Sequence, residues 1–407
     1  MGRSRYWGPF VACFLVPLMM GAGDPASPSD DATRRNGRIP SHGHREIRLD
    51  QELWRTDPDD EPFFRSIQKV LHDPESSEYF VLDTRSRAIH VYDHSGTRLR
   101  SLLLEGDGPG QVESLADVQF LEGNQLGLLS PIGPTIVRIT RQGDPVYNHL
   151  SRIDYFADTS GISNCYHFEV CGDGYVMAGE QSFQGHSFLG VYTDYGDRRR
   201  LLLDRPIHFR FDERVFDDHD DYLLAYKPWT VASNGLIYFC PDRTGTTDYR
   251  LLAVEPSGRA VRRIHRDFER RKRTDREIAA VRAAHFNGPE ALAGHAARGW
   301  RIVMPEFDPD VLSITELGAH LWVETSRSRD RMHAWVYDVF DLEGRFVEQA
   351  TVHCPDADNR KDVLYVFDET VLLVKGQYDA LARGHDTQQD ALQLICYERR
   401  DRLRVFQ

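Results

Sequence analysis

The feature that most constrains this chain is a short turn motif that recurs five times. In each copy an apolar residue ends a strand-like run and is followed by three residues and then a glycine. The glycines are Gly96, Gly143, Gly196, Gly258 and Gly344, and a second β-rich run follows each of them. Such a motif closes a β-hairpin whose last residue needs a positive φ, which glycine adopts at little cost.

The spacing of these turns predicts one four-stranded propeller blade per repeat. Gly96 and Gly143 are 47 residues apart, and the next gap is 53 residues, which suits a blade of about 40–50 residues. The later gaps of 62 and 86 residues leave room for insertions. With a sixth, degenerate repeat around Tyr397, we predict an all-β, six-bladed β-propeller over residues 44–407.

The N-terminus has the order of a secretory signal. Two arginines precede the apolar run Tyr6–Met20, which small residues follow. That run is too short, and too broken by prolines, for a good membrane span. We therefore predict a signal peptide at 1–23, an exported protein in the periplasm or outside the cell, and no transmembrane segment after signal removal. Residues 24–43, rich in Asp, Pro, Ser and Arg, are typical of a disordered lead-in.

Charge and cysteine content exclude several classes of protein. The net charge is −13, whereas nucleic-acid binding needs a basic surface, so no nucleic-acid partner is expected. The basic cluster Arg262–Arg276 lies among acidic residues and predicts a solvated entrance to a helix. None of the five cysteines after the signal forms a CxxC pair, which indicates mostly small buried side chains.

The longest gap between turns is expected to hold helices. Thr274–Glu277 has the spacing of a capping box, and apolar residues follow at helical spacing. Pro289 begins a second short helix that ends near Gly299. We predict a helical insertion at about 268–300, between blades four and five, packed on the propeller as a buttress rather than moving as a lid.

Three stretches carry a family resemblance. In Tyr79–Leu104 an aspartate, an isoleucine and a Tyr-Asp-x-x-Gly turn resemble the NHL-repeat pattern. The glycine-rich loop Gly106–Gln111 precedes a strand-like run, so it predicts a crossover between blades rather than a phosphate loop. Together with Trp335–Phe346, these stretches resemble bacterial secreted six-bladed β-propeller proteins, relatives of NHL-repeat propellers, over residues 44–397. The resemblance implies a fold and no particular chemistry.

Two segments are candidates to close the ring by adding the outer strand of the last blade. Glu46–Leu49 would do so from the N-terminus and Arg402–Phe406 from the C-terminus. Either would cover a strand edge that is otherwise exposed. The family resemblance favours closure from the N-terminus.

The candidate site is the mouth of the central channel, where the six innermost strands converge. The predicted channel-side residues are Arg65 or Gln68, Asp117, His167, Lys227, Ser313 and Asp362. Of these, Arg65, Asp117, His167, Lys227 and Asp362 are the candidate ligand-binding residues. Such a mixture suits a polar ligand or a metal. The alternative is that these charges only solvate a water-filled channel.

Two functions remain open. The chain lacks a His-Glu-x-x-His zinc helix and a Gly-x-Ser-x-Gly elbow, which favours a non-catalytic module that binds a protein, peptide or glycan. The alternative is a metal-assisted, lactonase-like hydrolase or lyase, because six-bladed relatives in the gluconolactonase and peptidyl-amidating lyase families hold a divalent metal at the channel mouth. Here three blades would deliver Asp117, His167 and Asp362 to one point on the axis, which makes them the candidate metal ligands, although those families' ligand motifs do not occur at matching places in this sequence.

Neither of the two candidate metal sites, the channel mouth and an acidic run, has an ideal set of residues. Arg65 and Lys227 would place positive charge beside the ion and oppose its binding. The acidic run Asp217–Asp221 offers oxygen ligands for Ca²⁺, but it lacks the glycine and the alternating spacing of an EF-hand loop. A solvated surface loop is the alternative interpretation of that run.

Overall fold

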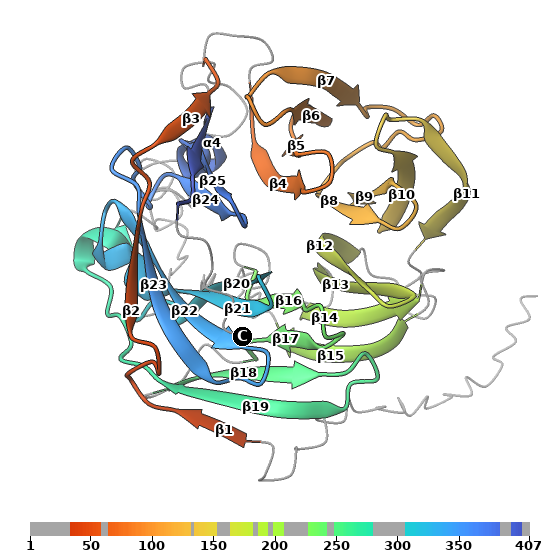
Figure 1. The fold of residues 1–407 in the computed structure, drawn as a ribbon. Coiled ribbons are helices and arrows are strands. Elements are labelled where there is room, and N and C mark those ends of the chain that lie inside the picture. The colour runs from red at the N-terminus through yellow and green to blue at the C-terminus, as the bar shows by residue number, and fades with distance from the viewer. Residues whose placement is uncertain are drawn as a thin grey trace, which may run out of the picture.

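The structure is a computed structural model of the chain. It describes residues 33–57, 64–131, 134–152, 163–181, 186–193, 198–206, 227–241, 248–279, 306–382 and 392–400. These residues form six sheets that surround a central axis like the blades of a propeller (Figure 1). The predicted all-β, six-bladed propeller is therefore confirmed.

Blades one to three each have four antiparallel strands in chain order, the first nearest the axis and the fourth at the rim (Figure 1). Their sequences are rich in β-branched and aromatic residues, which suit a pleated, buried surface. The strands are β4 (Ile67–Asp73), β5 (Glu78–Asp83), β6 (Ala88–Tyr92), β7 (Arg98–Leu103), β8 (Asp117–Leu121), β9 (Gln125–Ser130), β10 (Thr135–Thr140), β11 (Pro145–Arg152), β12 (Ser163–Cys171), β13 (Gly174–Gln181), β14 (His186–Thr193) and β15 (Arg198–Pro206).

Blades four to six repeat this order and add strands from the N-terminal segment. Blades four and five have their own four strands, whereas blade six has three and needs a fourth from elsewhere. The strands are β16 (Trp229–Val231), β17 (Ile237–Phe239), β18 (Asp248–Val254), β19 (Ala260–Asp267), β20 (Val311–Leu317), β21 (His320–Thr325), β22 (Ala334–Asp341), β23 (Phe346–His353), β24 (Val363–Val366), β25 (Thr370–Lys375) and β26 (Gln393–Glu398).

The N-terminal segment runs along the rim of the last three blades. β1 (Thr33–Asn36) pairs in parallel with β19, and β2 (His44–Arg48) pairs in parallel with β23. β3 (Glu52–Arg55) then pairs with β26 in antiparallel fashion and completes blade six. Thr33–Asn36 lies in the stretch whose composition predicts disorder. It is nevertheless a strand, because β19 offers it a free edge.

Closure thus comes from the N-terminus, as expected, but through a different strand. Most of the predicted segment Glu46–Leu49 belongs to β2, and Ile47 and Leu49 are buried in the hydrophobic cluster between blades five and six. In β3, Trp54 stacks on Tyr92 of blade one with ring centroids 6.1 Å apart. This indole lies between blade six and blade one. The other candidate, Arg402–Phe406, lies outside the described residues.

Four of the five turn glycines confirm the predicted hairpins. Gly96, Gly143, Gly258 and Gly344 have φ of 82°, 95°, 83° and 77°, and each joins the third strand of a blade to the fourth. The fifth turn, at Gly196, lies outside the described residues. A Cβ atom on Gly96 would lie 2.5 Å from the Trp54 ring. These turns therefore need glycine for packing as well as for conformation.

The hydrophobic core lies between neighbouring blades. Side chains of blades one and two pack together in one cluster, and those of blades six and one pack in another. Five cysteines, Cys165, Cys171, Cys240, Cys354 and Cys396, are buried and free, which confirms their predicted role as small core side chains. No helix in the described part of the chain is long and apolar enough to cross a membrane.

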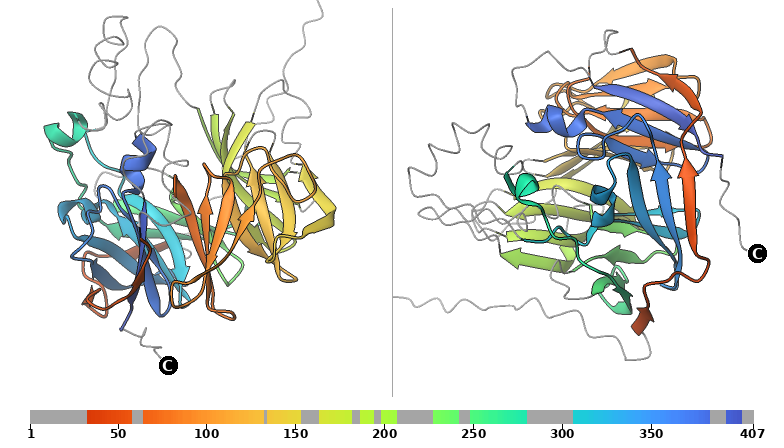
Figure 2. Two further views of the ribbon diagram at one scale, coloured as in Figure 1. Left: turned by 90° about the horizontal axis from the view of Figure 1, so that it is seen from above. Right: turned by 90° about the vertical axis from the view of Figure 1, so that its left-hand side faces the viewer.

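The little helix that the described residues contain gathers on one face of the ring (Figure 2). It comprises η2 (Ser326–Asp330), α4 (Gln377–Ala382) and the first turn after Thr274. η2 and α4 follow second strands, so antiparallel pairing places them at the end where the inner strands begin. We call this end the mouth face. The predicted capping box is present, since the Thr274 N–H donates to Glu277 Oε2 at 2.9 Å. Residues 280–305 of the predicted insertion lie outside the described residues.

Candidate functional site

Asp117 links the inner strands of blades one, two and three. It is the first residue of β8 and is fully buried. Its Oδ1 accepts hydrogen bonds from Lys69 Nζ and from the Val118 N–H, both at 2.8 Å. Its Oδ2 accepts from the Phe168 N–H at 3.0 Å. Both carboxylate oxygens are therefore used to join strands. Next to them lies His167 of β12, whose Nδ1 is 3.9 Å from Asp117 Oδ2.

Glu169 forms the corresponding link between blades three and four. Its Oε2 accepts hydrogen bonds from Thr230 Oγ1, at 3.2 Å, and from the Val231 N–H of β16. Its Oε1 forms an ion pair with Lys227. The Lys227 ammonium also lies 5.0 Å from the centroid of the Trp229 ring, a cation–π distance.

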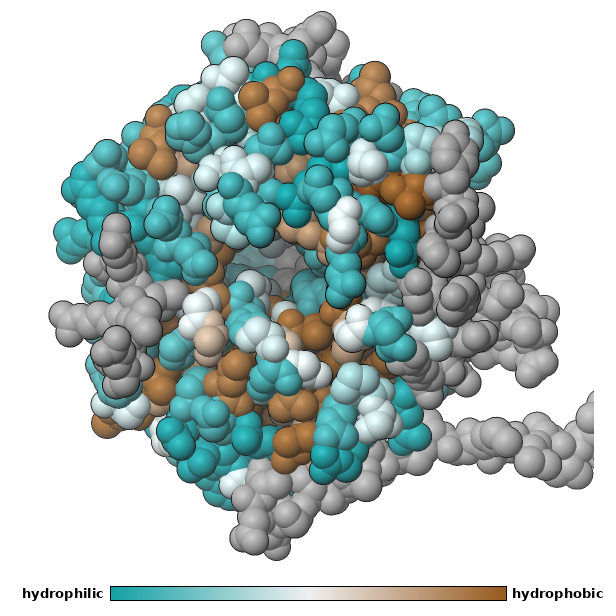
Figure 3. All heavy atoms as spheres, turned by 45° about the vertical axis from the view of Figure 1, so that its right-hand side comes forward, coloured by the Kyte–Doolittle hydropathy of each residue, from teal (hydrophilic) through white to brown (hydrophobic). Residues whose placement is uncertain are grey.

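The cations of these two pairs lie closer to the solvent than the carboxylates. The side chains of Lys69 and Lys227 are 15% and 26% exposed, against 1% for Asp117 and 14% for Glu169. Burial lowers the pKa of Lys69, the charge of Asp117 raises it, and the charge of Lys227 lowers it further. The two ammonium groups therefore act on one another. In each pair the lysine is therefore the more exposed member. The space-filling view is hollowed near the centre of the ring (Figure 3).

The polar wall continues into blade five. Ser313 of β20 is bridged to Lys227 in parallel, and the Ile314 N–H donates to the Lys227 carbonyl at 3.0 Å. Ser313 Oγ donates to Glu324 Oε2 of β21 at 3.2 Å. Burial raises the pKa of Glu324 to about 7, although Ser313, Arg329 and Ser328 act in the opposite direction. A half-buried carboxyl with this pKa can exchange a proton near neutral pH.

Two predicted site residues are not bonded to this cluster. Arg65 precedes β4, and its backbone N–H donates to Asp83 Oδ2 at 2.8 Å. Its exposed guanidinium makes no hydrogen bond or ion pair with any other residue that the structure describes. Asp362 is buried, and its carboxylate accepts from the N–H groups of Asp358 and Gly376, both at 2.8 Å. Burial raises the pKa of Asp362.

The metal ligands expected from the resemblance are not brought together. Within the described ranges, no three His, Cys, Asp or Glu side chains are grouped so that they could hold a metal ion. The oxygens of Asp117 and Asp362 are already bonded to N–H groups, and the Lys69 ammonium occupies the position beside Asp117 that a cation would need. Asp117, His167 and Asp362 therefore do not form the expected metal centre. The acidic run Asp217–Asp221 lies outside the described residues.

The structure adds Lys69, Glu169 and Glu324 to the residues named from the sequence. Each lies in a strand pair whose register shifts by one residue near the mouth. The shifts fall between Ile67 and Lys69, between Cys165 and His167, and between Val311 and Ser313. A β-bulge of this kind changes which side chains face the channel. Simple alternation along the sequence could not have located them.

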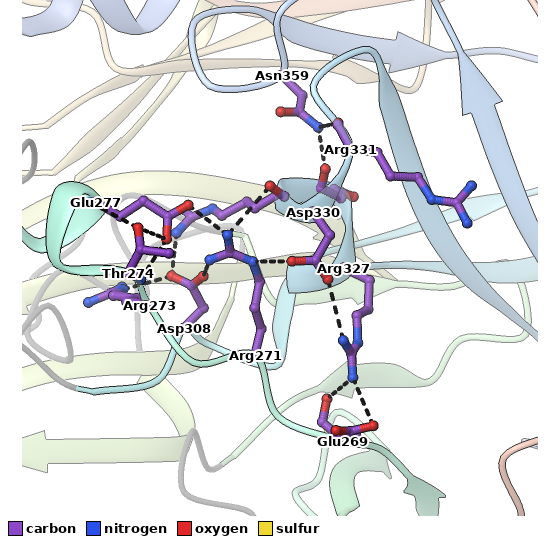
Figure 4. A network of polar contacts seen from close by, with 12 residues as sticks. Glu269, Arg271, Arg273, Thr274, Glu277, Asp308, Arg327, Asp330, Arg331 and Asn359 are labelled. Carbon is purple, nitrogen blue, oxygen red and sulfur yellow. Dashed lines mark hydrogen bonds and ion pairs between the residues drawn. The ribbon is translucent and has the colours of Figure 1, made fainter.

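A second polar cluster lies on the mouth face, at the base of the insertion (Figure 4). Its centre is the buried Asp308, whose carboxylate binds Arg271, Arg273 and Arg329 at 2.5–2.7 Å. Arg271 also pairs with Glu277, at 2.6 Å. Burial raises the pKa of Glu277, but hydrogen bonds from Arg271 and Thr274 outweigh it and bring the pKa to about 2.

This cluster corrects the interpretation of the basic run Arg262–Arg276 as a solvated helix entrance. Arg266, Arg271 and Arg273 are buried. Arg271 and Arg273 are tolerated there because both bind the Asp308 carboxylate, and a buried guanidinium requires such a partner. Arg266 forms an ion pair with Asp338, at 3.4 Å. The Arg273 N–H donates to the Glu306 carbonyl at 2.9 Å, so the two ends of the insertion are held together.

Comparison with known proteins adds no family assignment. No family model matches the chain, and no curated protein does. Solved structures are similar at low identity. A putative exported protein from Bacteroides fragilis is 9% identical, with a TM-score of 0.46, over 90% of this chain and 99% of that one.

Two further structures have comparable similarity. A gluconolactonase from Xanthomonas campestris is 10% identical, with a TM-score of 0.45, over 88% of this chain and 97% of its own. The calcium-binding protein regucalcin from Agrobacterium tumefaciens is 10% identical, with a TM-score of 0.44, over 88% and 97%. The six-bladed architecture itself rests on the six sheets of this chain.

Proposed function

We propose that this protein is an exported, non-catalytic binding module that takes a small polar ligand at the mouth of its channel. The observation that carries the proposal is that Lys69, His167 and Lys227 each lie beside a carboxylate, of Asp117 or Glu169, and are each more exposed than that carboxylate. Arg65 adds an exposed guanidinium at the same end of blade one. Export rests on the signal-like order of residues 1–23.

The arrangement of donors favours a ligand rich in hydrogen-bond acceptors. A carboxylate, or the hydroxyl and carbonyl oxygens of a glycan or peptide, would accept hydrogen bonds from these ammonium and imidazole groups. The paired carboxylates keep the net charge of the cluster low, so the ligand need carry only a small negative charge. Because Asp117 and Asp362 are fully hydrogen-bonded, neither is free to act as a base on that ligand.

A hydrolase or lyase using the same mouth is the second candidate, and Glu324 is the observation that favours it. A carboxyl with a pKa of about 7, hydrogen-bonded to Ser313, has the properties of a general acid or base. The metal-assisted form of this candidate requires ligands other than Asp117, His167 and Asp362.

Thermal-shift screening of purified protein against glycans, short peptides and small carboxylates tests the proposal. We expect hits that raise the melting temperature of the wild type but not that of an Arg65→Ala/Lys227→Ala double variant. Mass spectrometry of each hit should show no conversion. Hits that stabilise both proteins equally would contradict the site, and multiple turnovers of a hit would establish the enzyme instead. Arg331→Ala, an exposed arginine of the same face, is the control for surface charge.

A further inference from the structure

Glu324 is a carboxyl without a cation partner. It lies on β21, half-buried, and among the described residues no lysine, arginine or histidine nitrogen is within ion-pairing distance of it. Its hydrogen-bonding neighbours are two hydroxyl groups, those of Ser313 on β20 and Ser328 on η2. A half-buried carboxyl in such surroundings favours its neutral form.

The remaining charged and titratable groups around Glu324 do not supply a compensating cation. Arg329 of η2 is the nearest positive charge, but its guanidinium binds Asp308 at 2.6 Å. On β22, the buried Tyr337 stands opposite Glu324 in the strand register. Tyr378 of α4 acts on Tyr337 in turn, and burial raises the pKa of Tyr337 far above its usual value. The Tyr337 phenol is therefore neutral at physiological pH.

Glu324 is also connected to the binding cluster through the backbone. Lys227 is bridged to Ser313, and Ser313 donates to Glu324. The carboxyl therefore lies on the strand next to the one that is bridged to the Lys227 backbone. It belongs to the same wall, on the blade that follows Lys227.

We propose that Glu324, in its protonated form, donates a hydrogen bond to the ligand at the channel mouth, so that ligand binding takes up a proton. This inference rests on the proposed function and adds a property to it. The ligand it fits is a small anion or another oxygen-rich acceptor, because an ionised Glu324 would repel such a group. Binding is then strong where Glu324 is protonated and weakens as the pH rises through neutrality.

The test is isothermal titration at pH 6 and pH 8 with sulfate and tartrate, whose charges are constant over this range, and with the best screening hit. If only the protonated form binds, the dissociation constant of the wild type should rise about tenfold between the two pH values. Glu324→Gln keeps an N–H donor of similar shape that does not titrate. It should bind with the affinity of the wild type at pH 6 and show no dependence on pH.

Two control variants separate the alternatives. Glu316→Gln changes a carboxylate near the other end of β20, where it binds Ser233, and should behave as the wild type does. His167→Asn removes the imidazole beside Asp117. If the dependence on pH survives in Glu324→Gln but disappears in His167→Asn, the imidazole is responsible and the inference is overturned.

The outcomes for the wild type are equally distinct. Binding that does not change between pH 6 and pH 8 overturns the proton linkage and leaves the binding site intact. Absence of binding by every probe and every hit contradicts the proposed function, and the linkage with it.

A ¹³C NMR titration of glutamate-labelled wild type checks the carboxyl without any ligand. A Glu324 signal that titrates at its usual pKa of about 4.3 overturns the inference whatever the variants do.

Discussion

The carboxylates of the channel mouth first of all hold neighbouring blades together. Asp117 joins three inner strands, and Glu169 joins two. Six separate sheets meet around the axis with few backbone hydrogen bonds between them, so side-chain bonds at this level fix the spacing of the inner strands. The proposed binding groups Lys69 and Lys227 are positioned by these same bonds.

Asp117→Ala should strongly destabilise the protein. The substitution leaves the partly buried Lys69 ammonium and the buried Phe168 N–H without their partner, and breaking a buried pair in this way costs up to about 3–5 kcal/mol. Urea unfolding followed by circular dichroism measures the change. Glu122→Ala, at an exposed carboxylate directly after the last residue of β8, should change the free energy of unfolding by less than about 0.5 kcal/mol. A loss below about 1 kcal/mol for Asp117→Ala would show that the link is not structural.

The Glu324→Gln variant should gain stability relative to the wild type as the pH rises. Burial raises the pKa of Glu324 from its usual value to about 7, so the folded state holds a proton that the unfolded state has lost. The stability that the protonated Glu324 carboxyl contributes is fully present below pH 4.5 and is lost as the pH rises through 7. Between pH 4.5 and pH 8 the wild type should lose about 1–3 kcal/mol relative to the variant. Parallel curves of unfolding free energy against pH would contradict the raised pKa.

At the level of elements, local turn chemistry made the fold predictable from the sequence. A hairpin that ends in glycine is defined by a few adjacent residues, and Gly96, Gly143, Gly258 and Gly344 all have the expected conformation. The closing strand was harder to predict, because β2 and β3 are both short and each buries one apolar face. Their partners, β23 and β26, lie about 300 residues or more further along the chain.

The candidate site was predictable from the sequence only in part. Asp117 begins β8, Lys227 precedes β16 and His167 lies in the middle of β12, all innermost strands, which is where channel-side residues were expected. Lys69 and Glu169 were missed because bulges near the mouth shift the alternation. The burial of Arg271 depends on Asp308, which lies 37 residues further along the chain and gives no local signal.

Gly96→Ala tests the turn together with its packing. Gly96 has φ of 82°, and an added Cβ would lie 2.5 Å from Trp54. Positive φ and this overlap should together lower the free energy of unfolding by about 1–3 kcal/mol. Gly37→Ala is the matched control, since nothing lies within 4 Å of its added Cβ. Equal stability of the two variants in chemical denaturation would contradict the packing of β3 on this turn.

Truncation from the N-terminus tests whether the closing strand β3 matters more for stability than the rim strands β1 and β2. A chain that begins at residue 50 loses β1 and β2 but keeps β3, and we expect a monomer with a lower melting temperature. A chain that begins at residue 57 also loses β3 and Trp54, which exposes the edge of β26. We expect it to aggregate or to unfold without cooperativity. Size-exclusion chromatography and thermal melts compare the two, and equal behaviour would argue against closure by β3.

At the level of the whole molecule, the two faces of the ring carry different structural elements. One face carries the tight glycine turns, whose conformation leaves little freedom for variation. The mouth face carries η2, α4, the base of the insertion and both polar clusters (Figures 2 and 4). Rigid inner strands therefore present polar groups at one end of the channel, which is where propellers place binding sites.

The most direct test of the account is a crystal structure of the protein with its best screening hit. We expect electron density for the ligand at the channel mouth, within hydrogen-bonding distance of Lys227 and of Lys69, His167 or Arg65, with the Lys69–Asp117 pair intact. Density only on the rim or on the face of the glycine turns, or a metal ion bound by Asp117 with Lys69 displaced, would contradict it.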